Sequence, residues 1–228
     1  VIVLGSREGR FDAKGEKKSL VPFAASSIPL VTLGTFLLWF GWFGFNGFSQ
    51  LAMGTFDDVN AINKIAVNTH LAGSAGVVTG AVLTRLLGGK TDIIMMLNGA
   101  LAGLVAITAE PLTPTPFLAI VIGSIGAVIM YFGTKFLERQ KLDDVVGAIP
   151  VHMFAGIFGT LAVPLSNSAA NFGTQFQGVV SVCVFSFVLS YIVFKSMKQT
   201  IGLRISKEAE KLGTDKAEVG VIAYSIRD

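Results

Sequence analysis

Long apolar runs separated by short polar connections dominate the pattern of this chain. Runs close to the roughly 20 residues that cross the hydrocarbon core of a bilayer occupy residues 29–53, 61–87, 92–109, 116–137, 146–165 and 173–195. The pattern predicts six transmembrane helices. The expected fold class is therefore an all-α integral membrane protein.

Composition points the same way. Hydrophobic residues make up 52% of the chain and charged residues 14%, about half the charged share of a soluble domain, and the mean hydropathy is +0.66. Many of the 26 glycines fall inside the apolar runs. Gly99 and Gly103 have the small-xxx-small spacing that lets membrane helices approach closely. The single cysteine, Cys183, forms no intrachain disulfide and indicates no compartment.

Three regions follow from hydropathy. Residues 1–28 read as the end of a truncated helix and a cytoplasmic loop, residues 29–195 as one transmembrane bundle, and residues 196–228 as a polar cytoplasmic tail. Because VIVLG at the start resembles the last turn of a helix, we expect a piece of a larger protein. In the tail, SKEAEKLG predicts a short helix that begins at Ser206 and ends at Gly213.

Basic residues set the expected orientation. If six spans alternate, every one of the 18 Lys and Arg residues except Lys64 lies on the same side. The positive-inside rule places that side, with the C-terminal tail, in the cytoplasm. The loops 55–60, 110–115 and 166–171 are then external. The net charge of +3 is a topological signal, so we expect membrane lipid and no nucleic acid as a partner.

The stretch GWFGFNGFS in the first run concentrates unusual chemistry. Its aromatic and polar members share one helical face: Trp42, Phe45, Asn46 and Ser49. Its glycines occupy the opposing arc, where a neighbouring helix is expected to pack: Gly41, Gly44 and Gly47. An aromatic face attracts a small cation by up to about 2 kcal/mol when water is excluded, and a hydroxyl accepts a hydrogen bond from an N–H donor. Ordinary helix packing is the alternative interpretation.

His152 is a titratable residue inside the fifth run. Ionisable groups in a bilayer are costly and usually face a cavity or a pathway. Burial disfavours the charged imidazole, so one ring nitrogen would donate and the other accept. A structural hydrogen bond between helices is the alternative. Together with the aromatic face, His152 suits a small polar solute that sheds a proton, such as ammonium.

Several motifs together resemble a known family. They are LWFGWFGFNGFS (38–49), the pair Asn68 and Thr69, NGALAGLVAIT (98–108), DDVVGAIPVHMFAGIFGTLAVPL (143–165) and the tail element Gly202, Leu203 and Arg204. In this order, over nearly the whole chain, they are similar to the second half of an ammonium transporter of the Amt/Mep/Rh family.

The resemblance implies a fold of eleven helices in two inverted halves plus a last helix, a homotrimer with one pore per subunit, and transport of ammonium or ammonia. This chain would supply helices six to eleven. By motif, Ser49 resembles the recruitment-site hydroxyl, Phe45 the inner gate and Trp42 the pore-lining tryptophan. His152 resembles the second pore histidine. The positions that we expect beside the pore are Asn46, Asn68 and Thr69.

The resemblance also implies a location in the plasma membrane and a tail that contacts a PII-type signalling protein. Here Val219–Ile222 depart from the family's polar run, which weakens the expectation of tail regulation. Pro150, two residues before His152, departs as well and predicts a kink. For His70, which follows the Asn68 and Thr69 pair, a structural role is the expectation.

Three other functional classes predict different sequence features. A sensor that signals ammonium through the tail is the main alternative, although no further signalling domain follows residue 195. Half of an unrelated six-plus-six transporter would call for polar residues and broken helices at mid-membrane, whereas these runs carry almost no charge. An enzyme is not expected, since no nucleophile–base pair, metal-ligand cluster or phosphate loop is visible. No cofactor is expected either.

Overall fold

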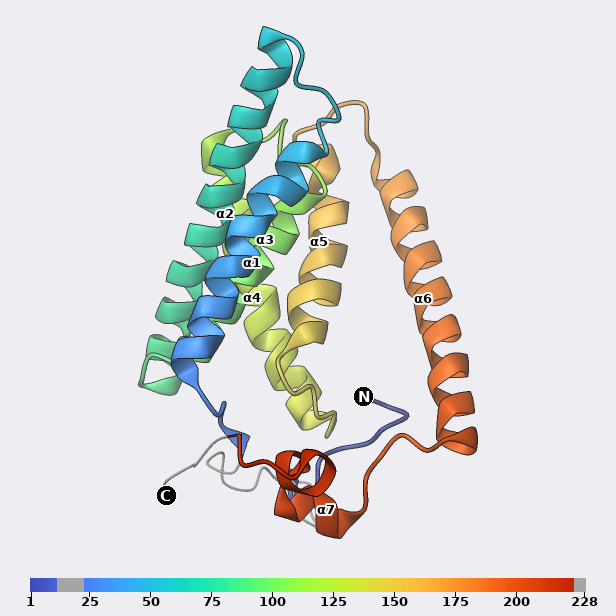
Figure 1. Cartoon of the computed structure of the whole chain (residues 1–228). Coiled ribbons are helices and arrows are strands. Elements are labelled where there is room, and N and C mark those ends of the chain that lie inside the picture. The colour runs from blue at the N-terminus through green and yellow to red at the C-terminus, as the bar shows by residue number, and fades with distance from the viewer. Residues whose placement is uncertain (12–22, 224–228) are drawn as a thin grey trace. The chain divides into compact units, whose positions relative to one another are not determined.

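The computed structural model describes residues 1–11 and 23–223, and its regular structure there is entirely helical. The elements are α1 (Ile28–Phe48), α2 (Phe56–Gly88), α3 (Ile93–Thr108), α4 (Pro116–Arg139), η2 (Ile149–Phe154), α5 (Ala155–Ala162), η3 (Val163–Leu165), α6 (Phe172–Thr200), α7 (Lys207–Leu212) and η4 (Asp215–Val219) (Figure 1). Of the basic residues behind the charge asymmetry, Lys14, Lys17, Lys18 and Arg227 lie outside the described residues.

Each predicted apolar run contains a helix. Four of the described helices, α1, α2, α4 and α6, are long and apolar enough to cross a membrane by length and composition. The other two runs hold shorter apolar helices, Ile93–Thr108 and Ile149–Leu165. The all-α membrane fold class is confirmed, while two of the six expected spans are shorter than the rest.

Two helix boundaries differ from their predicted positions. The first helix ends at Phe48 rather than near residue 53, and Leu51 beyond it has a positive φ of 60°. The second begins at Phe56 rather than 61 because Thr55 caps it. The Thr55 hydroxyl accepts a hydrogen bond from the Asp58 amide at 3.1 Å, and the Asp58 carboxylate accepts one from the Thr55 amide at 3.0 Å. This reciprocal pair of hydrogen bonds satisfies two backbone amides at the start of the helix, and a hydropathy pattern contains no information about such capping.

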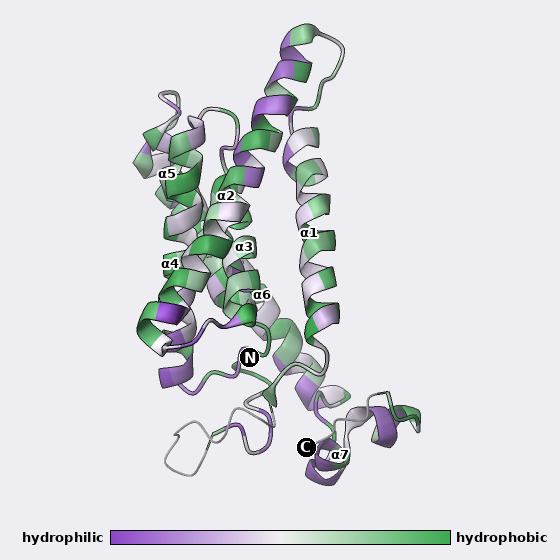
Figure 2. Cartoon of the chain, turned by 90° about the vertical axis from the view of Figure 1, so that its left-hand side faces the viewer, coloured by the Kyte–Doolittle hydropathy of each residue, from purple (hydrophilic) through white to green (hydrophobic). Residues whose placement is uncertain are grey.

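The chain divides into two compact units, which are described separately. The helix unit comprises Pro29–Phe136 and Val145–Ser181. The terminal unit comprises Val1–Ile28, Leu137–Asp144 and Val182–Asp228. Hydrophobic residues predominate along α1 of the helix unit, whereas hydrophilic residues predominate in α7 of the terminal unit (Figure 2).

Small residues bring helix backbones together in the helix unit. A Cβ added to Gly76 of α2 would overlap the carbonyl oxygen of Gly99 in α3, and one added to Gly103 would overlap that of Ala72. The same close approach occurs between Gly159 of α5 and the carbonyl of Ala106. The predicted role of the Gly99 and Gly103 pair in helix packing is confirmed. α3 therefore lies in the interior, with half of its residues buried.

Charged hydrogen bonds organise the terminal unit. Asp143 is 7% exposed, and its carboxylate accepts from the Arg7 amide at 2.9 Å and from Arg7 Nε at 2.8 Å. In the tail, Ser206 Oγ accepts from the Ala209 amide at 3.1 Å. α7 begins after that cap and ends before Gly213. The predicted tail helix is confirmed at both ends.

Candidate functional site

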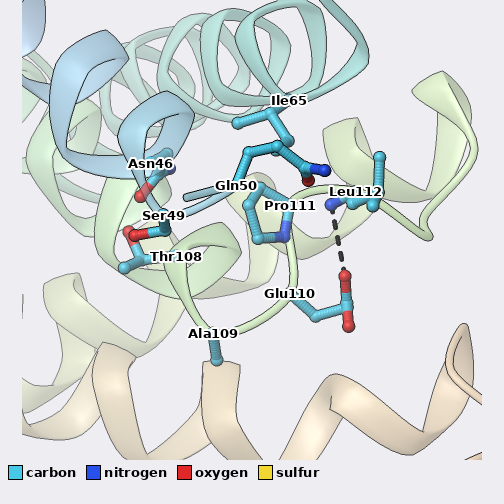
Figure 3. A pocket seen from close by; sticks show the side chains of 9 residues that line it. All are labelled: Asn46, Ser49, Gln50, Ile65, Thr108, Ala109, Glu110, Pro111 and Leu112. Atoms are coloured by element: carbon cyan, nitrogen blue, oxygen red, sulfur yellow. Dashed lines mark hydrogen bonds between the residues drawn. The ribbon is translucent and has the colours of Figure 1, made fainter. Parts of the chain in front are cut away.

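A pocket of about 240 Å³ lies in the helix unit between the end of α1, α2 and the loop after α3 (Figure 3). Its lining residues are Asn46, Ser49, Gln50, Ile65, Thr108, Ala109, Glu110, Pro111 and Leu112. Two of the residues singled out from the sequence, Asn46 and Ser49, thus meet at one site. The pocket exists because α1 stops at Phe48, which leaves Ser49 and Gln50 at the rim.

Ser49 presents its oxygen as an acceptor. The Ser49 hydroxyl donates its proton to the carbonyl of Phe45, one turn earlier, at 2.9 Å. The side chain is otherwise exposed. Because a hydroxyl has one proton and two acceptor lone pairs, what remains for a solute in the pocket is hydrogen-bond acceptance.

Asn46 adds a second acceptor. The residue is 2% exposed, and its Nδ2 donates to the Thr69 hydroxyl at 3.0 Å. Its Oδ1 is buried and has no hydrogen-bond partner within the described part of the chain. In Figure 3 this oxygen lies on the side of Ser49 and Thr108. An unpaired buried carbonyl costs about 1–3 kcal/mol, so a donor entering here would recover free energy.

Thr108 links Trp42 to the pocket. The Trp42 indole donates to Thr108 Oγ1 at 2.7 Å, and the Thr108 hydroxyl donates to the carbonyl of Leu104 at 2.7 Å. Trp42 does not line the pocket itself. The sequence reasoning missed Thr108 as a site residue, although it closes the motif NGALAGLVAIT that was singled out. The side chain of Thr108 is positioned by the hydrogen bond from Trp42, which lies 66 residues earlier in the chain.

Asn68 and Thr69 have distinct positions. Asn68 is 2% exposed, and its Nδ2 donates to the carbonyls of Pro111 and Pro114, both at 2.9 Å. It therefore holds the loop that forms one wall of the pocket. Thr69 orients the Asn46 amide. Neither residue lines the pocket; each positions a residue or loop that does.

Phe45 and the glycine arc only partly match the expectation. Phe45 is 66% exposed and does not line the pocket, and its ring centroid lies 6.0 Å from that of Trp42. Of the three glycines, Gly47 is buried against Ile62, while a Cβ on Gly41 would meet nothing within 4 Å. The predicted packing surface is therefore confined to the end of α1 in the described chain.

His152 lies on a π-helical turn, η2, that leads into α5. Pro150 stands in the first turn of η2, and the amide of Ala155 bonds to the carbonyls of His152 and Pro150. The expected distortion at Pro150 is thus a widened turn. The His152 side chain is exposed, while its neighbour Val151 is buried in a cluster against which Trp42 packs. His152 does not line the pocket.

The remaining predicted residues lie elsewhere. The exposed ring of His70 lies 5.6 Å from Trp39 and 6.3 Å from Phe43, centroid to centroid. In the terminal unit, Gly202 has a positive φ of 79°, and Arg204 contacts Glu210 with an Nη2–Oε2 distance of 2.8 Å. Among the described residues, no group of three or more His, Cys, Asp or Glu side chains is arranged to hold a metal ion.

Comparison with known proteins gives consistent matches. The profile of the Ammonium Transporter Family matches residues 1–224. The chain is 38% identical over 244 residues to ammonium transporter Amt2 of Archaeoglobus fulgidus, covering 98% of this chain and 51% of that protein. It is 35% identical over 234 residues to ammonium transporter Amt1 of Haloferax mediterranei, covering 97% and 45%. The chain therefore spans about half the length of the curated relatives it matches.

Solved structures agree with this similarity. A structure titled "Sensor Amt Protein" superposes with a TM-score of 0.86 at 33% identity, covering 95% of this chain and 55% of that one. The crystal structure of Candida albicans Mep2 superposes with a TM-score of 0.76 at 25% identity, covering 95% and 50%.

Proposed function

The chain belongs to the ammonium transporter family, and on this premise we propose that it forms part of a multi-pass membrane protein that conducts ammonium or ammonia, with the Asn46 and Ser49 pocket receiving the ion. Family membership names the class of solute. The pocket supplies the place where this chain would first hold it.

The observation that carries the proposal is the polarity of the pocket. Ser49 and Thr108 have each given their only hydroxyl proton to a backbone carbonyl, and Asn46 Oδ1 has no donor within the described residues. The side-chain oxygens offered by these three residues are therefore acceptors. An ammonium ion has four N–H donors and no acceptor, so it complements such a site, whereas an anion does not.

Phe45, Trp42 and His152 form the proposed path beyond the pocket. Trp42 touches Thr108 at the pocket and packs against the cluster that contains Val151, next to His152. Phe45 and His152 are both exposed in this chain. Exposed aromatic and imidazole groups on apolar helices fit a pore wall that further chain would complete. There, an apolar constriction would disfavour the charged ion, and a neutral imidazole would accept or donate a proton.

Assembly and location follow as parts of the same proposal. The family resemblance is the basis for proposing a homotrimer in the plasma membrane. The tail is placed in the cytoplasm, since 17 of the 18 basic residues fall on one side of the alternating runs. The tail, with Gly202, Leu203 and Arg204 at its start, would be the surface that meets a PII-type partner.

A sensor is the second candidate. It is favoured by one observation: the structure titled "Sensor Amt Protein" superposes over 95% of this chain at 33% identity. A sensor would bind ammonium in the same pocket and pass the signal through the terminal unit without a sustained flux. Both candidate functions therefore require ammonium binding in the pocket, and only transport requires a sustained flux of ammonium or ammonia.

An ammonium pulse applied to proteoliposomes of the complete protein tests the proposal. We expect a saturable current in the parent that His152→Ala abolishes or changes in ion selectivity. His70→Ala is the matched control, because it removes the other imidazole of the chain from a position outside the proposed path. Its current should equal that of the parent.

Three outcomes separate the readings. Equal currents in the parent and in His152→Ala would remove His152 from the path. Uptake of ammonia without current in the parent would make the transport electroneutral. Neither current nor uptake in folded parent protein would overturn transport and leave the sensor.

A further inference from the structure

Glu110 is one of the residues that line the Ser49 pocket, and its carboxylate accepts a hydrogen bond from the Leu112 amide (Figure 3). We propose that this carboxylate is the fixed anionic group that concentrates ammonium at the pocket and sets the affinity of the site. The inference rests on the proposed function and adds a specificity-determining residue to it. Neither the aromatic face nor the family motifs pointed to Glu110.

The carboxylate is held from two sides. Glu110 Oε1 accepts from the amides of Leu112 and Thr113 at 3.3 and 3.2 Å. Glu110 Oε2 accepts from Asn167 Nδ2 at 2.7 Å. Asn167 is itself oriented, because its Oδ1 accepts from the Ala169 amide at 3.0 Å. The carboxylate is therefore held in position before any solute arrives, which is what electrostatic preorganisation requires.

The loop that carries Glu110 is also fixed. Asn68 bonds to the carbonyls of Pro111 and Pro114 on either side of the Glu110 contacts. The hydroxyls of Thr113 and Ser166 share a hydrogen bond of 2.9 Å. Since these other hydrogen bonds fix the loop, its conformation does not require a negative charge at Glu110. A neutral amide oxygen would accept the same backbone hydrogen bonds.

The charge of the surroundings favours a cation. Within the described residues, no Lys or Arg forms an ion pair with Glu110. The segments 49–64, 109–116 and 163–175 contain three acidic residues, Asp57, Asp58 and Glu110, and one basic residue, Lys64, so their net charge is negative. Gln50, also in the pocket wall, donates to the Asp58 carboxylate at 3.4 Å. On the predicted topology these segments lie outside the cell, so their net negative charge attracts cations to the external side of the pocket.

A second observation in the same pocket points to a donor ligand. Asn46 Oδ1 is buried and unpaired among the described residues, and Asn46 is 2% exposed. A carboxylate attracts any small cation, while an unpaired amide oxygen beside Ser49 rewards one that carries N–H donors. Together they distinguish ammonium from a spherical ion that binds only through charge.

Ammonium uptake by proteoliposomes of the complete protein tests the role of Glu110. Glu110→Gln keeps an oxygen for the hydrogen bonds from Leu112 and Thr113, loses the acceptor for Asn167 Nδ2 and removes the charge. For the loss of one charge among the residues that line a partly wet pocket, we expect the half-saturating ammonium concentration to rise roughly three- to tenfold. The maximal uptake rate should stay within twofold of the parent. The difference between parent and variant should shrink as ionic strength rises, because mobile ions screen the carboxylate.

Two variants give matched controls. Asp57→Asn removes an equal charge from an exposed position outside the pocket, and its half-saturating concentration should stay within twofold. Glu110→Asp restores the charge and should return most of the affinity. If Glu110→Gln does not fold, the salt dependence of Asp57→Asn carries the test. Its half-saturating concentration should still rise with ionic strength, and loss of that rise would assign the effect to Asp57 and overturn the role of Glu110.

The outcomes separate this inference from the proposed function. Saturable uptake by the parent with an unchanged half-saturating concentration in Glu110→Gln would overturn the role of Glu110 and leave transport intact. Equal losses in Glu110→Gln and Asp57→Asn would assign the effect to the overall surface charge and overturn the local role. A parent without uptake would overturn both.

Discussion

The helix unit and the terminal unit are held together by opposite means. In the helix unit, glycine and alanine let the backbones of α2, α3 and α5 touch, as at Gly76 against Gly99 and Gly159 against Ala106. In the terminal unit, buried Asp143 collects Arg7 and Arg10, with N–O distances of 2.8 and 3.4 Å. One region depends on the absence of side chains, and the other depends on their charge.

The difference follows from the solvent around the contacts: the glycine contacts join apolar helices, whereas the ion pairs lie in loops and the tail, outside the part of α6 that the terminal unit also contains. Between helices in lipid, apolar burial gives little driving force, because lipid tails are as apolar as leucine, so close packing stabilises the contact. Loops and tails in water gain from charge-assisted hydrogen bonds. The two regions should therefore fail under different perturbations, namely added volume in the helix unit and lost charge or acid in the terminal unit.

The largest expected effect is that of a single added methyl group. Gly76→Ala places a Cβ against the Gly99 carbonyl. Because the contact is with backbone atoms, no flexible side chain can move aside to relieve it. We expect a loss of roughly 3 kcal/mol in the free energy of unfolding. The measurement is the midpoint of thermal unfolding and the yield of monodisperse protein.

Gly178→Ala in α6 is the matched control, because a Cβ there meets nothing within 4 Å. Its unfolding midpoint should equal or slightly exceed that of the parent, since alanine favours helix. A similar loss in both variants would contradict close backbone packing as the basis of the helix unit.

Removing one charged partner should have the next largest effect. Arg7→Ala deletes the Nε and Nη2 donors that lie 2.8 and 2.9 Å from the Asp143 oxygens. Because Arg10 remains and Arg7 is partly exposed, we expect the free energy of unfolding of the terminal unit to fall by about 1–2 kcal/mol. The stability of the helix unit should not change. Hydrogen exchange should show less protection in residues 137–144 and unchanged protection in α3.

Lys207→Ala provides the control for this variant. Lys207 and Glu8 form an exposed pair at 3.4 Å, of the kind that contributes at most about 0.5 kcal/mol. If Lys207→Ala and Arg7→Ala lost protection equally, the buried position of Asp143 would be irrelevant to the terminal unit.

Acid should produce the smallest of these effects and only at low pH. Burial alone would raise the pKa of Asp143, but hydrogen bonds from Arg7 and the charges of Arg7 and Arg10 outweigh burial and lower that pKa. A lowered pKa stabilises the folded state above the unfolded value of about 3.9, and that stabilisation is lost as pH falls through the folded value. The pKa of Glu210 is lowered too, by the Glu8 amide and by Arg204.

The terminal unit should therefore be unchanged between pH 7 and 5 and loosen below about pH 4. Pepsin cleavage within residues 137–144, at pH 4, 3 and 2, measures that loosening. Asp143→Asn should already be cleaved at pH 4. Fluorescence of Trp39 and Trp42, the two tryptophans of the chain, reports on the helix unit and should stay constant. A simultaneous change in fluorescence and cleavage would mean that the two regions unfold together.

The sequence predicted those features that depend on neighbouring residues. Every apolar run holds a helix, and Ser206 and Gly213 bound the tail helix as expected, because periodicity and capping act within a few residues. The closeness of Gly99 and Gly103 to other helices also followed from their spacing. The motif that resembled an ammonium transporter was sufficient to identify the family.

Tertiary structure alone decided which residues share the pocket. Nothing in the sequence marks Thr108, at the end of the motif NGALAGLVAIT, or Glu110 as a site residue. They join Asn46 and Ser49 only because α3 ends beside the end of α1. The orientation of the Asn46 amide likewise depends on Thr69, 23 residues away, whose hydroxyl accepts from Asn46 Nδ2. The physical reason is range: helix formation is local along the chain, whereas the polarity of a pocket depends on which distant donors have already been used.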